Sequence, residues 1–119
     1  MDTPQPVSNL KPEIQYEDFA KLDIRVGTIV AAELVPETDK LIKCTIDFGE
    51  LGTRTIVSGI AQFRTPESLV GKQLPYLVNL APKMLRGVES AGMLLAVGDG
   101  DQFALLTPDT ELVPGSRVK

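Results

Sequence analysis

The stretch IKCTIDFGELGTRTIVS, residues 42–58, decides the fold of this chain. Apolar and polar side chains alternate through its first half, which puts one set on a single face: Ile42, Cys44, Ile46 and Phe48. A period of two is typical of a strand with one buried face. The segment GELG, residues 49–52, is a strong hairpin signal. The stretch therefore predicts two strands that pair with each other.

The residues before this hairpin predict a short helical turn and a third strand. Asp18 is placed to cap a turn within residues 16–23. Alternation then puts five apolar side chains of the strand on one face: Ile24, Val26, Val30, Ala32 and Leu34. Gly27 interrupts this strand, and a glycine inside a strand indicates a bulge or a strong bend.

The residues after the hairpin predict a short helix and further strands. The segment TPESL, residues 65–69, has a threonine cap and a proline at the first helical position. The segment KQLPYLVNL places four apolar side chains on one face, Leu74, Tyr76, Val78 and Leu80, and its Pro75 indicates an edge strand or a bulge. Residues 91–97 form another apolar run, and GDGD, residues 98–101, is interpreted as a tight turn joining two strands.

About five short strands with one short helix between the third and the fourth indicate an all-β fold, a small barrel that is closed or nearly closed. A five-stranded OB-fold barrel fits best, with residues 103–119 as a C-terminal extension. Residues 1–14, rich in proline and small polar residues, are interpreted as a flexible tail or linker. Residues 15–119 then form one domain.

Composition excludes several classes of protein. The chain has 119 residues, 43% apolar and 24% charged, which is the balance of a globular domain. No apolar run reaches the roughly 20 residues that cross a bilayer, and no secretion signal is recognised, so we expect no membrane contact and a cytoplasmic location. One cysteine and no histidine remove a disulfide, a cysteine-based metal site and the commonest general base. We therefore expect no catalytic residue, metal or cofactor.

The charges are unevenly spread along a chain whose net charge is -4. Residues 40–90 carry seven basic and four acidic side chains, so the middle of the chain is locally positive. Lys83 and Arg86 lie in a short loop bounded by Pro82 and Gly87, between two apolar segments, which predicts contact with a polyanion. The alternative is that these cations are ordinary solvated surface. Met84 either closes the barrel end or contacts a base or a sugar.

Three separated motifs occur in one order: DFAKLDIRVGTIVAAELVPETDKL, VSGIA and NLAPKMLRGVESAGMLLA. With them the chain resembles the tRNA-binding domain family, found at the C-terminus of bacterial methionyl-tRNA synthetases and as stand-alone proteins. Related domains are the endothelial monocyte-activating polypeptide and a bacterial secretion chaperone. The resemblance runs from Tyr16 to the C-terminus.

The resemblance implies an OB-fold that binds tRNA at its elbow through shape and backbone, without catalysis, and a homodimer formed with the C-terminal extension. It implies tRNA as the partner and a methionyl-tRNA synthetase as a further one. Motif by motif, the resemblance assigns most of the tRNA-binding residues, and sequence proximity alone adds Lys43: Lys40, Lys43, Ser58, Lys83, Met84, Arg86, Ser90 and Met93.

The chemistry of these residues fits RNA. Lysine and arginine neutralise phosphates, and hydroxyls can contact a phosphate or a ribose 2′-OH. Aromatic residues make up only 5% of the chain, so base stacking is poorly supplied and folded RNA held by its backbone is favoured over a single strand. The rival hypothesis is a peptide-binding secretion chaperone, which would use an exposed apolar groove. Whether the chain is a stand-alone protein or a domain of a synthetase stays open.

Overall fold

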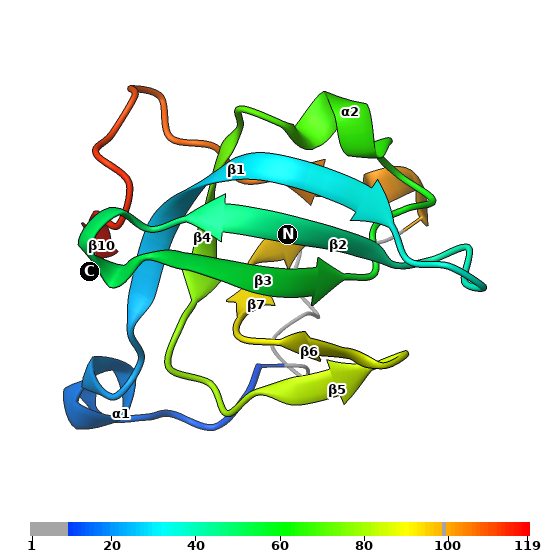
Figure 1. Ribbon diagram of the computed structural model, residues 1–119. Helices are drawn as coiled ribbons and strands as arrows, with labels where there is room; N and C mark the ends of the chain where they lie inside the picture. Colours follow the sequence, from blue (N-terminus) through cyan, green and yellow to red (C-terminus); the bar gives the residue numbers. More distant parts are fainter. Residues whose placement is uncertain (1–9, 99) are drawn as a thin grey trace.

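The computed structural model describes residues 10–98 and 100–119. Five antiparallel strands curl into a nearly closed barrel, which confirms the predicted fold class (Figure 1). Their order is β3 (Thr53–Ser58), β2 (Ile42–Asp47), β1 (Ile24–Leu34), β4 (Gln73–Leu77) and β7 (Met93–Leu94). Of the tail predicted over residues 1–14, residues 1–9 lie outside the described part, and residues 10–14 are exposed and form no helix or strand.

The central hairpin is built as its alternation predicts. Strand β2 (Ile42–Asp47) pairs with β3 (Thr53–Ser58) over its whole length, from Ile42 opposite Ser58 to Asp47 opposite Thr53. A 3-10 turn, η2 (Gly49–Leu51), joins the two strands, and the backbone N–H of Phe48 donates to Gly52 O at 3.0 Å. The four side chains predicted to share a face are all buried: Ile42, Cys44, Ile46 and Phe48.

The predicted face of strand β1 (Ile24–Leu34) is wrong in part. Ile24 and Val26 are buried outside the core cluster, whereas Ile29 is in it. The register with β2 shifts between Ile29 and Ala31, and the extra residue, Val30, is 49% exposed. This bulge moves the core side from odd positions to even ones, and Ala32 then packs against the core. Leu34, at the strand end, is 55% exposed.

Gly27 is required by contact within the barrel wall and not by the bulge, which lies further along the strand. A Cβ on Gly27 would lie 2.6 Å from Phe48 Cε1 and closer still to Ile46 Cγ2. Only a residue without a side chain leaves room for these two core groups. The bend of β1 thus comes from two separate features, a close approach at Gly27 and a bulge at Val30.

Strand β4 (Gln73–Leu77) lies between β1 and β7 (Met93–Leu94), so the prediction that Pro75 marks an edge strand is wrong. Pro75 lacks an N–H, and its partner Val26 needs none from it, because the Val26 carbonyl accepts the Gly115 N–H at 2.7 Å. Leu80, predicted to share the buried face of this strand, is 47% exposed because the strand ends at Leu77.

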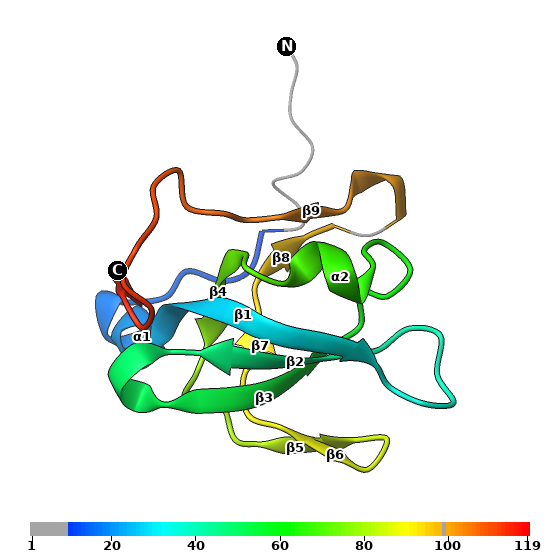
Figure 2. The ribbon, with the colours of Figure 1, turned by 45° about the horizontal axis from the view of Figure 1, so that its top comes forward.

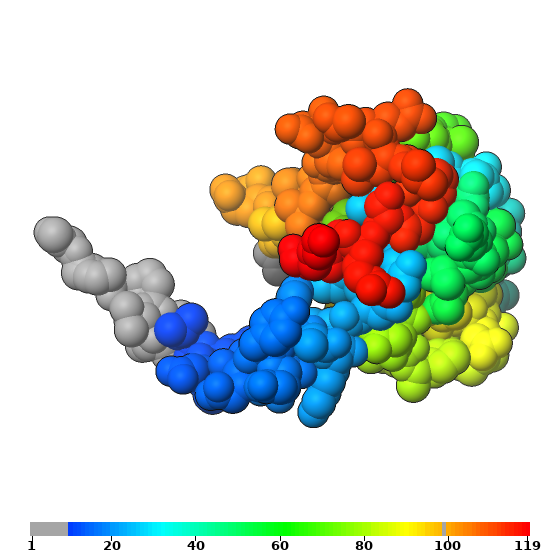
Figure 3. All heavy atoms as spheres, turned by 90° about the vertical axis from the view of Figure 1, so that its left-hand side faces the viewer, coloured from blue at the N-terminus to red at the C-terminus, as the bar shows by residue number. Residues whose placement is uncertain are grey.

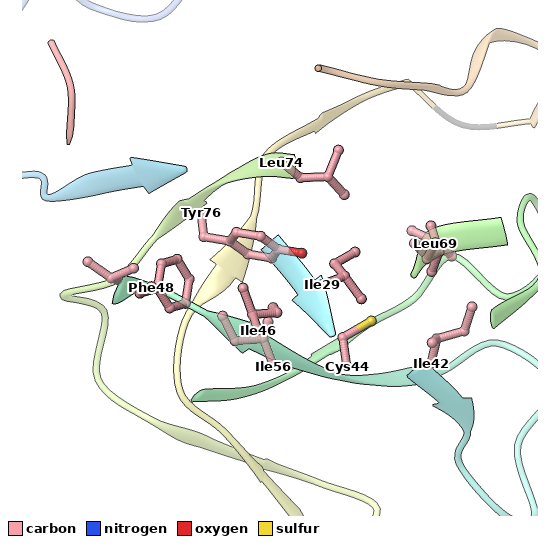
Figure 4. Packing of buried hydrophobic residues seen from close by; sticks show 11 residues of the cluster. Ile29, Ile42, Cys44, Ile46, Phe48, Ile56, Leu69, Leu74 and Tyr76 are labelled. Carbon is pink, nitrogen blue, oxygen red and sulfur yellow. The ribbon is translucent and has the colours of Figure 1, made fainter. Parts of the chain in front are cut away.

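The core fills the barrel with aliphatic side chains and two aromatic rings (Figure 4). Phe48 and Tyr76 meet edge to face with their ring centroids 5.6 Å apart, and Tyr76 is 1% exposed. The predicted helix is present as α2 (Pro66–Leu69), which buries Leu69 completely. Thr65 stands at its N-cap position, but its side chain makes no capping bond, and its carbonyl accepts from Ser68 N at 3.1 Å.

Helix α1 (Tyr16–Ala20) and the C-terminal strand β10 (Arg117–Val118) lie at the barrel end opposite the loop that joins β1 and β2 (Figures 1 and 2). Helix α1 (Tyr16–Ala20) begins after Gln15, and Asp18 accepts the Gln15 N–H at 3.0 Å from inside the helix instead of standing at its N-cap. Strand β10 (Arg117–Val118) pairs with the start of β1, beside α1 (Figure 3). The loop between β1 and β2 projects from the other end.

Residues 96–105 form a small arm outside the barrel. Strand β8 (Ala96–Val97) pairs with β9 (Ala104–Leu105), and the 3-10 turn η3 (Gly100–Gln102) lies between them. Two paired strands thus flank the predicted turn over residues 98–101, of which residue 99 lies outside the described part. The C-terminal extension then returns to its own barrel, where Gly115 N donates to Val26 O at 2.7 Å.

Candidate nucleic-acid interface

The predicted basic loop is a two-stranded hairpin. Strands β5 (Lys83–Leu85) and β6 (Val88–Ser90) pair with Lys83 opposite Ser90 and Leu85 opposite Val88, and Arg86 and Gly87 form the turn (Figure 1). Both turn residues have positive φ angles, 51° and 81°, as a two-residue turn matched to the twist of the strands requires. The hairpin therefore presents its cations on a defined backbone, with Lys83, Met84 and Arg86 all exposed.

Arg86 occupies a backbone conformation that usually belongs to asparagine or glycine. A branched or long side chain in the left-handed region costs roughly 1–2 kcal/mol. In the described part of the chain, two non-glycine residues have a positive φ, Arg86 and Glu37. An arginine kept at a strained turn points to a use for its side chain, because the turn itself would be more stable with asparagine.

Neither Lys83 nor Arg86 forms an ion pair within residues 10–98 and 100–119. The acidic residue of the same hairpin, Glu89, stands opposite Met84 and forms no ion pair with either cation. The two side chains are therefore free to meet an anion from solution.

The base of the hairpin is fixed to strand β3 by three contacts. Ser90 Oγ accepts the backbone N–H of Val57 at 2.9 Å, and Ala91 N donates to Thr55 O at 2.9 Å. Arg54 Nη1 donates to Val78 O at 2.6 Å and to Ala91 O at 3.4 Å. These bonds join β3 to the segments before and after the hairpin, and they fix the hairpin relative to the barrel.

Ser90 was predicted to contact tRNA, but its side chain faces the barrel. The residue is 3% exposed, and its hydroxyl accepts from Val57 while lying 3.5 Å from Gly92 O. Because the Ser90 hydroxyl is buried and already bonded to β3, it can affect ligand binding only by holding the hairpin in place. Arg54, which has a similar role, was not singled out from the sequence, because nothing in its neighbourhood distinguishes it from other strand cations.

A cavity of about 500 Å³ lies between the hairpin, the segment after β3 and the β8–β9 arm. It brings together four of the predicted residues, Ser58, Lys83, Ser90 and Met93, from two of the three motifs. Met93 is 44% exposed at its side, and Phe63 and Phe103 contribute an apolar wall. The loop of Lys40 is tied to the same region, since Lys40 O accepts the Ala61 N–H at 3.0 Å.

The remaining predicted residues lie outside this cavity. Lys43 is on the outer face of β2, with its Nζ 3.3 Å from Glu33 Oε2, and it lines a second hollow with Arg54 and Glu89 on the other side of the hairpin. Met84 is 63% exposed and, like Lys40 and Arg86, lines neither hollow. The structure thus gathers the set around one hairpin, with Lys83 on one side of it and Lys43 on the other.

Other kinds of site were sought in the described residues. No group of three or more histidine, cysteine, aspartate or glutamate side chains is arranged there to hold a metal ion. Burial raises the pKa of the Cys44 thiol to about 11, so it stays protonated at neutral pH. None of the helices in the described part is long and apolar enough to span a membrane.

Known proteins are similar to this chain in sequence and in fold. The family model described as "Putative tRNA binding domain" matches residues 24–117. A "Methionine--tRNA ligase" of Porphyromonas gingivalis is 53% identical over 108 residues, which are 90% of this chain and 16% of that protein. The chain therefore spans about a sixth of the length of the curated relatives it matches.

Two solved structures are similar over most of the chain. The "MetRS related protein" from Pyrococcus horikoshii is 40% identical, with a TM-score of 0.85, and the match covers 92% of this chain and 100% of that one. The chaperone CsaA of Bacillus anthracis str. Ames is 36% identical, with a TM-score of 0.82, over 91% of this chain and 100% of that one. The similar proteins thus include both kinds considered from the sequence: proteins related to methionyl-tRNA synthetase, and a chaperone.

Proposed function

This chain belongs to the tRNA-binding domain family, and from that premise we propose that it binds tRNA at the elbow through shape and backbone, with little sequence preference. The observation that carries the proposal is the β5–β6 hairpin, where Lys83 and Arg86 are exposed and form no ion pair in the described part of the chain. Cations on a preformed backbone neutralise phosphates and release counterions without first leaving an internal partner.

The proposed roles follow from where each side chain lies. Lys83 and Arg86, with Lys40 from the neighbouring loop, contact phosphates. The Ser58 hydroxyl meets a phosphate or a ribose 2′-OH, and Met84 and Met93 contact sugar or base surfaces. Lys43 adds a contact on the far side of the hairpin once it leaves Glu33. Ser90 positions the hairpin from within.

The domain does no chemistry of its own in this proposal. The sequence contains no histidine, and its single cysteine is buried with a raised pKa. The binding site would serve either a stand-alone protein or a methionyl-tRNA synthetase, as its C-terminal domain or as a partner in trans, in the cytoplasm. In each case its part is to hold tRNA for a reaction that another domain performs.

A homodimer is part of the proposal. Apolar side chains are exposed at the barrel end that carries α1 and β10, away from the Arg86–Gly87 turn (Figure 1): Tyr16, Phe19, Leu22 and Val118. They come from residues 16–22 and the C-terminal extension, which lie side by side (Figure 3). A dimer through this end would leave both hairpins free, and two hairpins on one RNA raise the apparent affinity through effective concentration.

The second candidate function is peptide binding by a chaperone. The likeness to the chaperone CsaA favours it, as does the partly apolar cavity beside the hairpin. Peptide binding of that kind depends on apolar contact and should change little with salt, whereas binding to RNA phosphates should weaken steeply.

The test is a titration of unfractionated tRNA at 50 mM and at 200 mM salt, with duplex DNA and an unfolded peptide as controls. We expect tRNA affinity to fall with a log-log slope of about -0.7 to -0.9 per phosphate neutralised. Preferential binding of the peptide, insensitive to salt, would instead assign the chain to the chaperone branch.

A further inference from the structure

The cavity beside the hairpin has the features of a site for one unstacked nucleobase. We propose that it takes a base of the bound RNA while Lys83 holds the adjoining phosphate. This inference rests on the proposed tRNA binding and adds a subsite to it. Bases in the loops of folded RNA can turn out of the stack, and proteins recognise them by stacking and by hydrogen bonds to their edges.

The size and opening of the cavity suit such a ligand. Its volume of about 500 Å³ lies within the roughly 300–1,000 Å³ that small-ligand pockets occupy. Leu80 and Met93, which line it, are 47% and 44% exposed, so the cavity opens to solvent beside the hairpin. A flexible thioether such as that of Met93 makes favourable contacts with flat rings.

The wall of the cavity is aromatic and rigid. Phe63 and Phe103, forty residues apart in the chain, stack with centroids 4.5 Å apart and planes 11° from parallel. The Arg64 guanidinium lies over the Phe103 ring at 5.0 Å and also donates to Phe63 O at 2.8 Å. The two rings are thus held in place before a ligand arrives, which lowers the cost of binding a flat group. The sequence did not predict this stacked pair, because aromatic residues make up only 5% of the chain.

Two polar groups favour a nucleotide over an apolar peptide side chain. Ser58 lines the cavity, and its hydroxyl makes no hydrogen bond within residues 10–98 and 100–119, so it has no protein partner to leave for a base edge. Lys83 lines the same cavity and is exposed, which places a cation where a base in the cavity would carry its phosphate. An apolar side chain would satisfy neither group and would cover the hydroxyl at a cost.

The first test titrates AMP, GMP, CMP and UMP into the isotope-labelled protein and follows its amide chemical shifts. We expect shifts at Ser58 to Ile60, at Met93 and at Lys83. Ribose 5-phosphate, which has no base, is expected to shift Lys83 alone. The inference is overturned if the mononucleotides and ribose 5-phosphate give the same pattern, or if an apolar peptide moves the cavity residues and the mononucleotides do not.

The second test fills the cavity. Ala96→Trp places an indole from β8 in it, and Ala104→Trp is the matched control, because Ala104 lies on the paired strand outside the cavity. We expect Ala96→Trp to weaken tRNA binding on the order of tenfold, the effect of losing one stacked base, with the salt slope unchanged. Equal tRNA affinity in the two variants would overturn the inference.

The two proposals fail in different ways. If the wild-type protein binds tRNA with the expected salt slope but shows no base-dependent shifts, the cavity assignment is wrong and the proposed function stands. If it binds no tRNA, the proposed function is wrong, and the inference that rests on it falls too, whatever the free mononucleotides do.

Discussion

The two ends of the barrel use arginine in opposite ways. At the terminal end, which carries α1 and β10, Arg25 donates to both carboxylate oxygens of Asp23 at 2.7 and 3.2 Å, and Arg117 Nε lies 3.9 Å from the same carboxylate. At the hairpin end, Arg86 stands at a strained turn without an ion pair in the described chain. Paired cations hold the chain together, whereas unpaired cations at a fixed position are available to a ligand.

Arg54 lies beside the hairpin, but its guanidinium holds the chain together there. Its loss should have the largest effect on stability. Arg54→Ala removes the donors to Val78 O and Ala91 O, and we expect the free energy of unfolding to fall by about 2–3 kcal/mol, as for hydrogen bonds from a charged group. Denaturant unfolding measures this. Arg117→Ala is the control from the other end and should cost less than about 1 kcal/mol, because that pair is exposed. Equal losses in the two variants would contradict the distinction.

Ser90 should matter more for the fold than its predicted place in the binding site implies. Ser90→Ala leaves the Val57 N–H without its acceptor, and we expect a loss of about 1–2 kcal/mol in unfolding experiments. Ser58→Ala is the matched control, since that hydroxyl has no partner within the described residues, and it should change stability by less than about 0.5 kcal/mol. A reversed order would show that Ser90 is not the anchor of the hairpin.

The strain at Arg86 predicts opposite effects on stability and on binding. Arg86→Asn keeps a residue suited to positive φ and removes the charge, so we expect stability to rise by about 0.5–1 kcal/mol while tRNA affinity falls about fivefold. Thermal unfolding and tRNA titration on the same samples test the pair of effects. If Arg86→Asn binds tRNA as well as the wild type does, the strained turn has no role in recognition.

The smallest expected effect is a dependence on acid at the terminal end. The hydrogen bond from Arg25, with the nearby charge of Arg117, holds the pKa of Asp23 below its ordinary value of 3.8. A carboxylate with a lowered pKa in the folded state stabilises the fold above that value and loses its contribution as the pH falls through the folded pKa. The stability difference between the wild type and Asp23→Asn should therefore shrink from pH 5 to pH 2. A difference constant over that range would contradict this role.

Alternation and turn chemistry were sufficient to predict the barrel, because the β2–β3 hairpin depends on local residues alone. They failed at the Val30 bulge, where one extra residue changed the register. They also failed at Pro75, because the Val26 carbonyl opposite it accepts an N–H from Gly115, far along the chain.

The candidate site shows the same division. A loop rich in cations was visible from Lys83 and Arg86, whereas the inward turn of Ser90, the tie through Arg54 and the meeting of Phe63 with Phe103 depend on contacts between distant segments. The roles of the individual residues in binding stay predictions.

The most direct measurement is the salt dependence of tRNA binding in three forms of the protein: wild type, Lys83→Ala/Arg86→Ala, and Arg25→Ala/Arg117→Ala. Each variant removes two positive charges, from the hairpin or from the terminal end. We predict that the hairpin variant flattens the log-log slope by about two units and that the terminal variant, if it remains folded, keeps the wild-type slope. Equal slopes in all three, or a flattened slope only in the terminal variant, would contradict the claim that the unpaired cations of the hairpin hold the RNA.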